Sequence, residues 1–107
     1  MNNNVILLKI SKFLGRKLLK HECIQISKIC KYYGKELVYQ VCGEIKYESW
    51  YLNDLKKCLD NRLEEMYVFN SKNNPNQLQS IDEFIFEIKK DKHLVSNLLE
   101  KTSSSIK

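Results

Sequence analysis

The sequence predicts an all-α protein, a compact bundle of about five to six helices. Only three glycines and one proline occur in 107 residues, so few tight turns interrupt the chain. Apolar residues recur at intervals of three and four, the spacing that places them on one face of a helix. The apolar content of 43% is enough for a core in a chain of one-domain length.

Two helices are predicted before residue 34. The first covers about Asn4 to Leu14 and ends at Gly15, because glycine readily terminates a helix. The second covers about Leu19 to Tyr33. Their expected core-facing residues are Ile6, Ile10, Phe13 and Leu14 in the first helix, and Leu19, Cys23, Ile26, Cys30 and Tyr33 in the second.

Gly34 is predicted to be a joint between two helices. It follows the last periodic residue of the second helix, where a left-handed backbone carries no steric cost for glycine. A third helix begins at about Lys35, and we expect it to fold back on the second as an αα-hairpin hinged at Gly34. Its inward residues are Leu37, Val38, Val41, Cys42 and Ile45.

The second half of the chain predicts three more helices. One spans about Trp50 to Phe69, one follows a capping-box pattern at Ser80, and a short one covers about His93 to Lys101. Ile81 is expected to face the core with Phe84, Ile85 and Ile88. We therefore expect a core domain over residues 1–69, a polar loop over 70–79, helices over 80–102 that pack on the core or on a partner, and a frayed tail over 103–107.

The positive charge is concentrated in the first half of the chain. The net charge is +5, but residues 1–57 carry eleven Lys and Arg against five Asp and Glu, for +6. Residues 58–107 carry seven basic and eight acidic residues, for −1. This asymmetry indicates an anionic partner for the first half, although lysine also serves simply as solvated surface.

No cofactor, metal site or membrane association is predicted. The four cysteines stand 7, 12 and 16 residues apart, without the close pairs typical of zinc sites. They are expected to be free thiols in a reducing compartment, which favours a cytoplasmic location. No apolar run is long enough to span a bilayer.

The sequence does not predict an enzyme. His21, Glu22 and Cys23 are the only adjacent histidine, acid and thiol, but neighbours in a helix point about 100° apart and cannot converge on one substrate. We expect His21 and His93 to lie at the surface. Glycine-rich phosphate-binding loops are absent from the sequence.

The candidate functional residues are those that suit DNA. Lysines that lie off the core-facing positions would neutralise phosphates, and nearby aromatic rings would stack on unpaired bases. Trp50 and Tyr51 equally suit anchoring a helix start in the core. The predicted DNA-binding residues are Lys28, Lys31, Lys35, Lys46, Trp50, Tyr51, Lys56 and Lys57.

The order of residues from Phe13 to Leu59 resembles the C-terminal domain of the DnaD/DnaB-type replication-initiation (primosome) proteins of low-GC bacteria and their phages. That family shows a Phe, a Gly-Arg pair, a helix that starts near a Glu, and a Tyr-Gly joint before Glu-Leu-Val. The matching residues here are Phe13, Gly15, Arg16, Leu18, Leu19, Glu22, Ile26, Tyr33, Gly34, Glu36, Leu37 and Val38. The terminal family motif maps to Tyr51, Leu55 and Leu59, with Leu in place of the family's Ile and Trp.

The resemblance implies a compact helical module that binds single-stranded or duplex DNA with little sequence preference and contacts other replication-initiation proteins. The winged-helix domain of full-length members has no counterpart in this sequence, so the resemblance implies a stand-alone domain, a domain excised from a longer protein, or a phage or mobile-element relative. A helical protein–protein interaction module, similar to an immunity protein or a viral inhibitor of a host factor, is the alternative. Its expected docking residues lie in the last two helices, where they could instead complete the core: Phe84, Ile85, Ile88, Leu94, Leu98 and Leu99. An RNA-binding domain is a third hypothesis.

Overall fold

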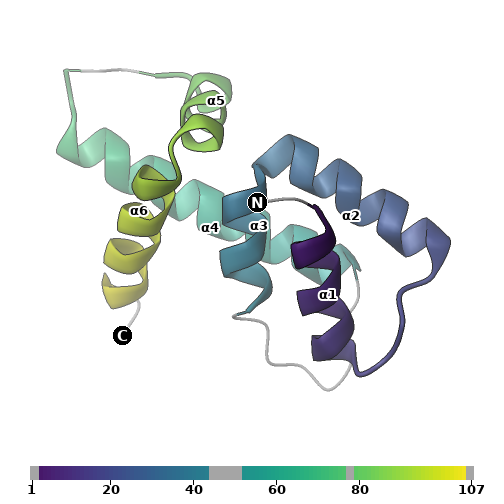
Figure 1. The fold of residues 1–107 in the computed structure, drawn as a ribbon. Helices are drawn as coiled ribbons and strands as arrows, with labels where there is room; N and C mark the ends of the chain where they lie inside the picture. The colour runs from purple at the N-terminus through teal and green to yellow at the C-terminus, as the bar shows by residue number, and fades with distance from the viewer. Residues whose placement is uncertain (1–2, 44–51, 77–78, 106–107) are drawn as a thin grey trace. The chain divides into compact units, whose positions relative to one another are not determined.

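The structure is a computed structural model that describes residues 3–43, 52–76 and 79–105. Within these residues it contains six helices and no strand, which confirms the predicted all-α class (Figure 1). No helix in the described ranges is both long and apolar enough to cross a bilayer. The chain divides into two compact units, residues 1–59 and residues 60–107, and the division falls inside α4 (Leu52–Asn73).

The first unit contains three helices that pack on one another. α3 (Lys35–Cys42) contacts both α1 (Asn3–Leu14) and α2 (Lys20–Tyr33), and α1 also contacts α2. Most of the periodic apolar residues of these helices lie inside, as their spacing predicts. The buried apolar residues of this unit are Ile6, Ile10, Ile26, Cys30, Tyr33, Leu37, Val38, Val41, Cys42, Leu55 and Leu59.

Gly34 is the joint between α2 and α3, as predicted. Its N–H donates to the Cys30 carbonyl at 2.9 Å, and its carbonyl accepts from Val38 N–H at 3.2 Å. Its backbone has φ 94° and ψ 139°. The positive φ was expected, but the ψ lies outside the left-handed helical region and in a part of the map that is nearly restricted to glycine.

Gly15 ends α1 through a Schellman motif. With φ 71° it donates its N–H to the Lys12 carbonyl at 3.2 Å, while Arg16 N–H reaches the Ser11 carbonyl at 3.3 Å. The Ser11 hydroxyl then donates to the Arg16 carbonyl at 2.6 Å. These bonds fix the direction in which the chain leaves α1 toward α2.

The second unit consists of the rest of α4 with α5 (Ile81–Lys90) and α6 (Lys92–Ser105). The Arg62 guanidinium donates to the Leu99 carbonyl at 3.1 Å and so connects α4 to α6. The rings of Tyr67 and Phe84 meet edge-on with centroids 5.6 Å apart, which connects α4 to α5. The buried apolar residues of this unit are Leu63, Met66, Phe84, Ile85, Ile88, Val95, Leu98 and Leu99.

Two helices are longer than the sequence predicts. α4 continues to Asn73 rather than ending at Phe69, because asparagine side chains satisfy carbonyls of its last turn: Asn73 Nδ2 donates to Phe69 O at 2.8 Å. α6 continues to Ser105, so residues 103–105 of the expected frayed tail are helical. Thr102 is buried there, and its hydroxyl donates to the Leu98 carbonyl at 2.7 Å.

Three apolar residues predicted to face the core lie at the surface instead. Leu19 is the N-cap of α2 with an extended backbone (φ −75°, ψ 158°), so the helical periodicity does not apply to it. Ile81 is the first residue of α5, directly after the N-cap Ser80, and is also exposed. Phe13, in the last turn of α1, is more than one-third exposed.

Candidate nucleic-acid interface

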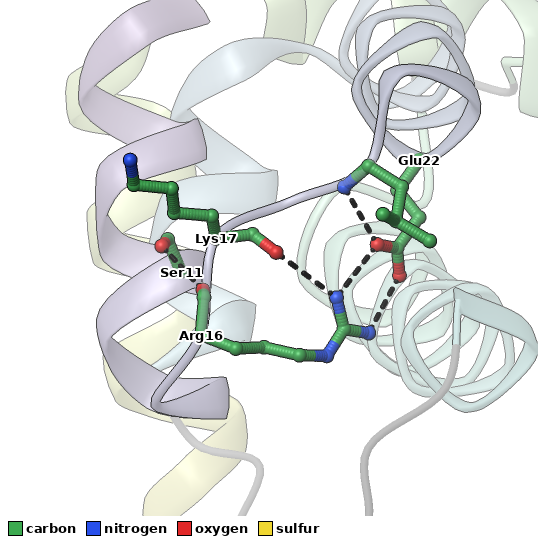
Figure 2. A network of polar contacts seen from close by, with 5 residues as sticks. Ser11, Arg16, Lys17 and Glu22 are labelled. Atoms are coloured by element: carbon green, nitrogen blue, oxygen red, sulfur yellow. Dashed lines mark hydrogen bonds and ion pairs between the residues drawn. The ribbon is translucent and has the colours of Figure 1, made fainter.

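The start of α2 is held by an ion pair between Arg16 and Glu22. The Arg16 guanidinium donates to both carboxylate oxygens of Glu22, at 2.8 and 2.9 Å, and to the Lys17 carbonyl at 3.2 Å (Figure 2). Glu22 also accepts the Leu19 N–H at 2.9 Å. Glu22 therefore replaces the missing side-chain cap at Leu19, since it satisfies a donor at the helix start from the third helical position.

This network neutralises the single carboxylate of α2. Hydrogen bonds from Arg16, and then from the Leu19 backbone, lower the pKa of Glu22 to about 2. The residue is only 9% exposed, so its charge is directed toward Arg16 and the helix start. Because α2 carries no other Asp or Glu, its exposed side has basic and neutral side chains only.

Three lysines lie on the exposed side of α2. Lys20, Lys28 and Lys31 are separated by eight and three residues, so they share one stripe of the helix, opposite the buried Ile26. None of these three makes a hydrogen bond or ion pair with another described residue. With Cys23, Ile24 and Ser27 they line a surface depression of about 390 Å³.

The structure brings together only some of the predicted DNA-binding residues. Lys28 and Lys31 lie on the α2 stripe. Lys35, at the start of α3, and Lys56 and Lys57, in α4, are exposed in the same unit but do not line the depression. The remaining predicted residues, Lys46, Trp50 and Tyr51, lie outside the described residues.

Sequence reasoning missed Lys20 and Ile24. Their signal was available, because Lys20, Ile24 and Lys28 repeat every four residues on the side of the helix away from Cys30. Ile24 is 49% exposed in the middle of this stripe, where no core contact requires an apolar side chain.

Lys9, in contrast to the lysines of α2, makes contacts that stabilise the fold. Its ammonium group donates to the Tyr39 carbonyl at 2.9 Å and lies 3.7 Å from the centroid of the Tyr39 ring. Lys9 therefore connects α1 to α3 and is less available to a ligand than the lysines of α2.

The cysteines and histidines form no cluster with recognisable chemistry in the described ranges. None of the four cysteines forms a disulfide within the described residues, and burial raises the pKa of Cys30 to about 11 and that of Cys42 above its usual value. His21 and His93 are exposed, as predicted. Among the residues that the structure describes, no group of His, Cys, Asp or Glu is placed to hold a metal ion.

The chain was compared with known proteins. No protein-family model, no curated protein and no solved structure matches it. The case for a function therefore depends on the geometry and charge of the two units.

Proposed function

We propose that this chain is a non-catalytic, cytoplasmic DNA-binding accessory of replication initiation that holds DNA through lysine–phosphate contacts with little dependence on sequence. The DNA-binding part of the proposal is supported by the first unit. Its place in replication initiation is supported by the resemblance to DnaD/DnaB-type domains.

The observation that carries the proposal is the lysine stripe on α2, whose ammonium groups have no partner among the residues that the structure describes. Unpaired lysines can bind phosphate without first breaking an ion pair, and each phosphate that they neutralise releases condensed counterions. Glu22, the single carboxylate of α2, is paired with Arg16 and so does not compete with DNA phosphates for the lysines.

The charge of the first unit supports the same function. The compact unit of residues 1–59 contains all eleven basic residues of the first half and only five acidic ones, so it carries +6. The second unit carries −1. An excess of positive charge confined to one compact unit is typical of proteins that bind nucleic acid by their electrostatic field.

Fluorescence anisotropy with labelled single-stranded and duplex oligonucleotides tests the proposal. If Lys20, Lys28 and Lys31 neutralise three phosphates of a duplex, affinity should fall roughly fortyfold between about 50 and about 200 mM salt. Affinity that changes little over this range would refute the phosphate mechanism. An equal-length RNA competitor would separate DNA from RNA binding.

A protein-interaction module is the second candidate. The docking residues predicted for it on α5 and α6 are buried in the second unit, except Leu94, which is half-buried. The outer side of α5 favours this function instead. Phe86 is 61% exposed, Ile81 is also exposed, and the Lys90 ammonium covers the Phe86 ring at 4.0 Å from its centroid. Exposed aromatic side chains are frequent anchors in protein interfaces. The test is cross-linking in the native cell: a protein captured by the wild-type chain and lost with Phe86→Glu would favour this function, and equal capture by both would exclude α5 as the docking surface.

A further inference from the structure

We infer that α2 lies in the major groove of duplex DNA with Ile24 toward the base edges and its lysines on the flanking phosphates. This inference rests on the proposed function, since it requires that the first unit binds DNA. It adds the form of DNA that is bound and the helix face that enters it.

The length of the lysine stripe suits a groove. An α-helix is roughly 10–12 Å across with its side chains, which fits the roughly 12 Å width of the major groove, and the stripe from Lys20 to Lys31 extends about 16 Å along the helix at 1.5 Å per residue. Lysines near the two ends of the stripe can therefore reach phosphates on opposite strands while the middle of the helix lies between them. Phosphate contacts of this kind fix orientation and carry no sequence information.

The middle of the stripe carries one aliphatic side chain between small residues. Ile24 stands four residues after Lys20 and four before Lys28, and is 49% exposed. Cys23 and Ser27 beside it are small, and the Ser27 hydroxyl is already used in a bond to the Cys23 carbonyl at 2.9 Å. An aliphatic side chain in this place matches the thymine methyl group, which projects into the major groove.

The same stripe is poorly suited to a single strand. Proteins that bind single strands stack the bases on aromatic rings, and none of the described residues that line the depression is aromatic. Tyr32 on α2 is exposed, but its ring is packed edge-on against Tyr33 with centroids 4.7 Å apart. A membrane surface is also a poor match, because Ile24 is the single aliphatic residue of the stripe and membrane-bound helices need a broad apolar face.

The experiment combines anisotropy with dimethyl sulfate protection on a mixed-sequence 20-base-pair duplex. Dimethyl sulfate methylates guanine N7, which faces the major groove, and adenine N3, which faces the minor groove. The full-length chain is compared with Ile24→Asp and with Leu8→Asp. Leu8 is a matched control, because it is an aliphatic residue of the same unit that is 62% exposed on α1.

The inference predicts that the wild-type chain protects guanine N7 and leaves adenine N3 reactive. Ile24→Asp should lose this protection and bind the duplex at least tenfold more weakly, whereas Leu8→Asp should keep both. Circular dichroism of the variants excludes loss of folding as the cause, since both substitutions are at exposed positions.

Other results overturn the inference in distinguishable ways. Salt-sensitive duplex binding with protection of adenine N3, or with no protection, would overturn the groove placement and leave the proposed function standing. Tighter binding to a single-stranded 20-mer, or Ile24-dependent binding to anionic phosphatidylserine vesicles without duplex binding, would also overturn it. Absence of binding to every nucleic acid at low salt would overturn both.

Discussion

At the residue scale, Glu22 is the side chain on which the start of α2 depends most. It accepts two hydrogen bonds from Arg16 and one from the Leu19 backbone, and its pKa is lowered to about 2. Gly15, Arg16 and Glu22 are also positions at which the sequence resembles the DnaD/DnaB-type domains. In this structure they terminate one helix and begin the next, so the resemblance at these positions has a structural explanation.

Glu22→Ala should destabilise the protein by about 1 kcal/mol, the usual loss when a helix-start cap is removed. Urea denaturation followed by circular dichroism measures this difference. Glu36→Ala, in the first turn of α3, is the control, because Glu36 contacts the Gln40 side chain and caps no backbone donor in the described contacts. An equal loss for both variants would contradict the capping role of Glu22.

The stability difference between wild type and Glu22→Ala should depend on pH. The folded-state pKa of Glu22, about 2, lies below the ordinary glutamate value of about 4.3, so the ionised form is favoured by folding. This contribution is fully present above about pH 5 and is lost as the pH falls toward 2. Denaturation at pH 7, 4 and 2.5 should show the two proteins converging, and a constant difference would show that the charge of Glu22 contributes nothing.

Gly34→Ala should destabilise the protein by roughly 1 to 3 kcal/mol, since φ 94° with ψ 139° is a conformation that residues with a Cβ rarely adopt. Gly43→Ala is the matched control. Gly43 has an ordinary φ of −79°, so an added Cβ brings crowding without backbone strain: it would lie 2.9 Å from Lys9 Nζ, which contacts Tyr39, and 3.6 Å from the Gln40 carbonyl oxygen. Chemical denaturation of the two variants separates backbone strain from side-chain crowding, and comparable losses would contradict the role of Gly34 as a strained joint.

At the element scale, α2 has one face buried in the core and an exposed face that carries the lysines proposed to bind DNA. Ile26 is fully buried, whereas Ile24 is about half exposed among the lysines. Both are isoleucines in one helix, so their substitution separates packing from surface function.

Ile26→Ala should cost about 2 to 5 kcal/mol of stability, because it removes buried methyl groups and leaves a cavity. Ile24→Ala should change stability by no more than about 0.5 kcal/mol. Thermal unfolding of the two variants checks this difference, and a large loss with Ile24→Ala would mean that its side chain belongs to the core.

The helix boundaries show which parts of the fold could be predicted from the sequence. Gly15, Gly34 and Ser80 identified helix ends correctly, because each acts through its own backbone or side chain: Ser80 Oγ accepts from Glu83 N–H at 3.2 Å. The predicted end of α4 was wrong, because asparagine is typical of loops but here its side-chain amides donate to carbonyls of the helix. The start of α6 was missed by one residue, since Asp91 caps it at His93 N–H and Leu94 N–H.

Only part of the candidate site could be predicted from the sequence. Lysines off the core-facing positions could be identified from periodicity, and Lys28, Lys31, Lys35, Lys56 and Lys57 are all exposed. Which of them are free of ion pairs depends on contacts across helices, as Lys9 shows by its bond to Tyr39. The removal of Glu22 from the surface of α2 likewise depends on Arg16, six residues away and outside the helix.

At the scale of the whole molecule, charge and structure divide at nearly the same place. The sequence places +6 in residues 1–57, and the first compact unit ends at Leu59, with no charged residue in between. The expected core domain ran to residue 69, whereas the boundary between the two compact units falls in the sequence between Leu59 and Asp60. The proposed DNA binding would therefore belong to the first unit, and exposed lysines of the second unit should contribute little to it.

The most direct test of this account is the salt dependence of duplex affinity for two variants with the same change in net charge. Lys28→Gln/Lys31→Gln removes two lysines of the α2 stripe, and Lys72→Gln/Lys92→Gln removes two exposed lysines of the second unit. The slope of log K against log salt should become shallower by about 2 for the α2 variant and stay at the wild-type value for the control, because each lost phosphate contact removes about 0.9 from the slope. Equal slopes for the two variants would contradict the assignment of DNA binding to α2.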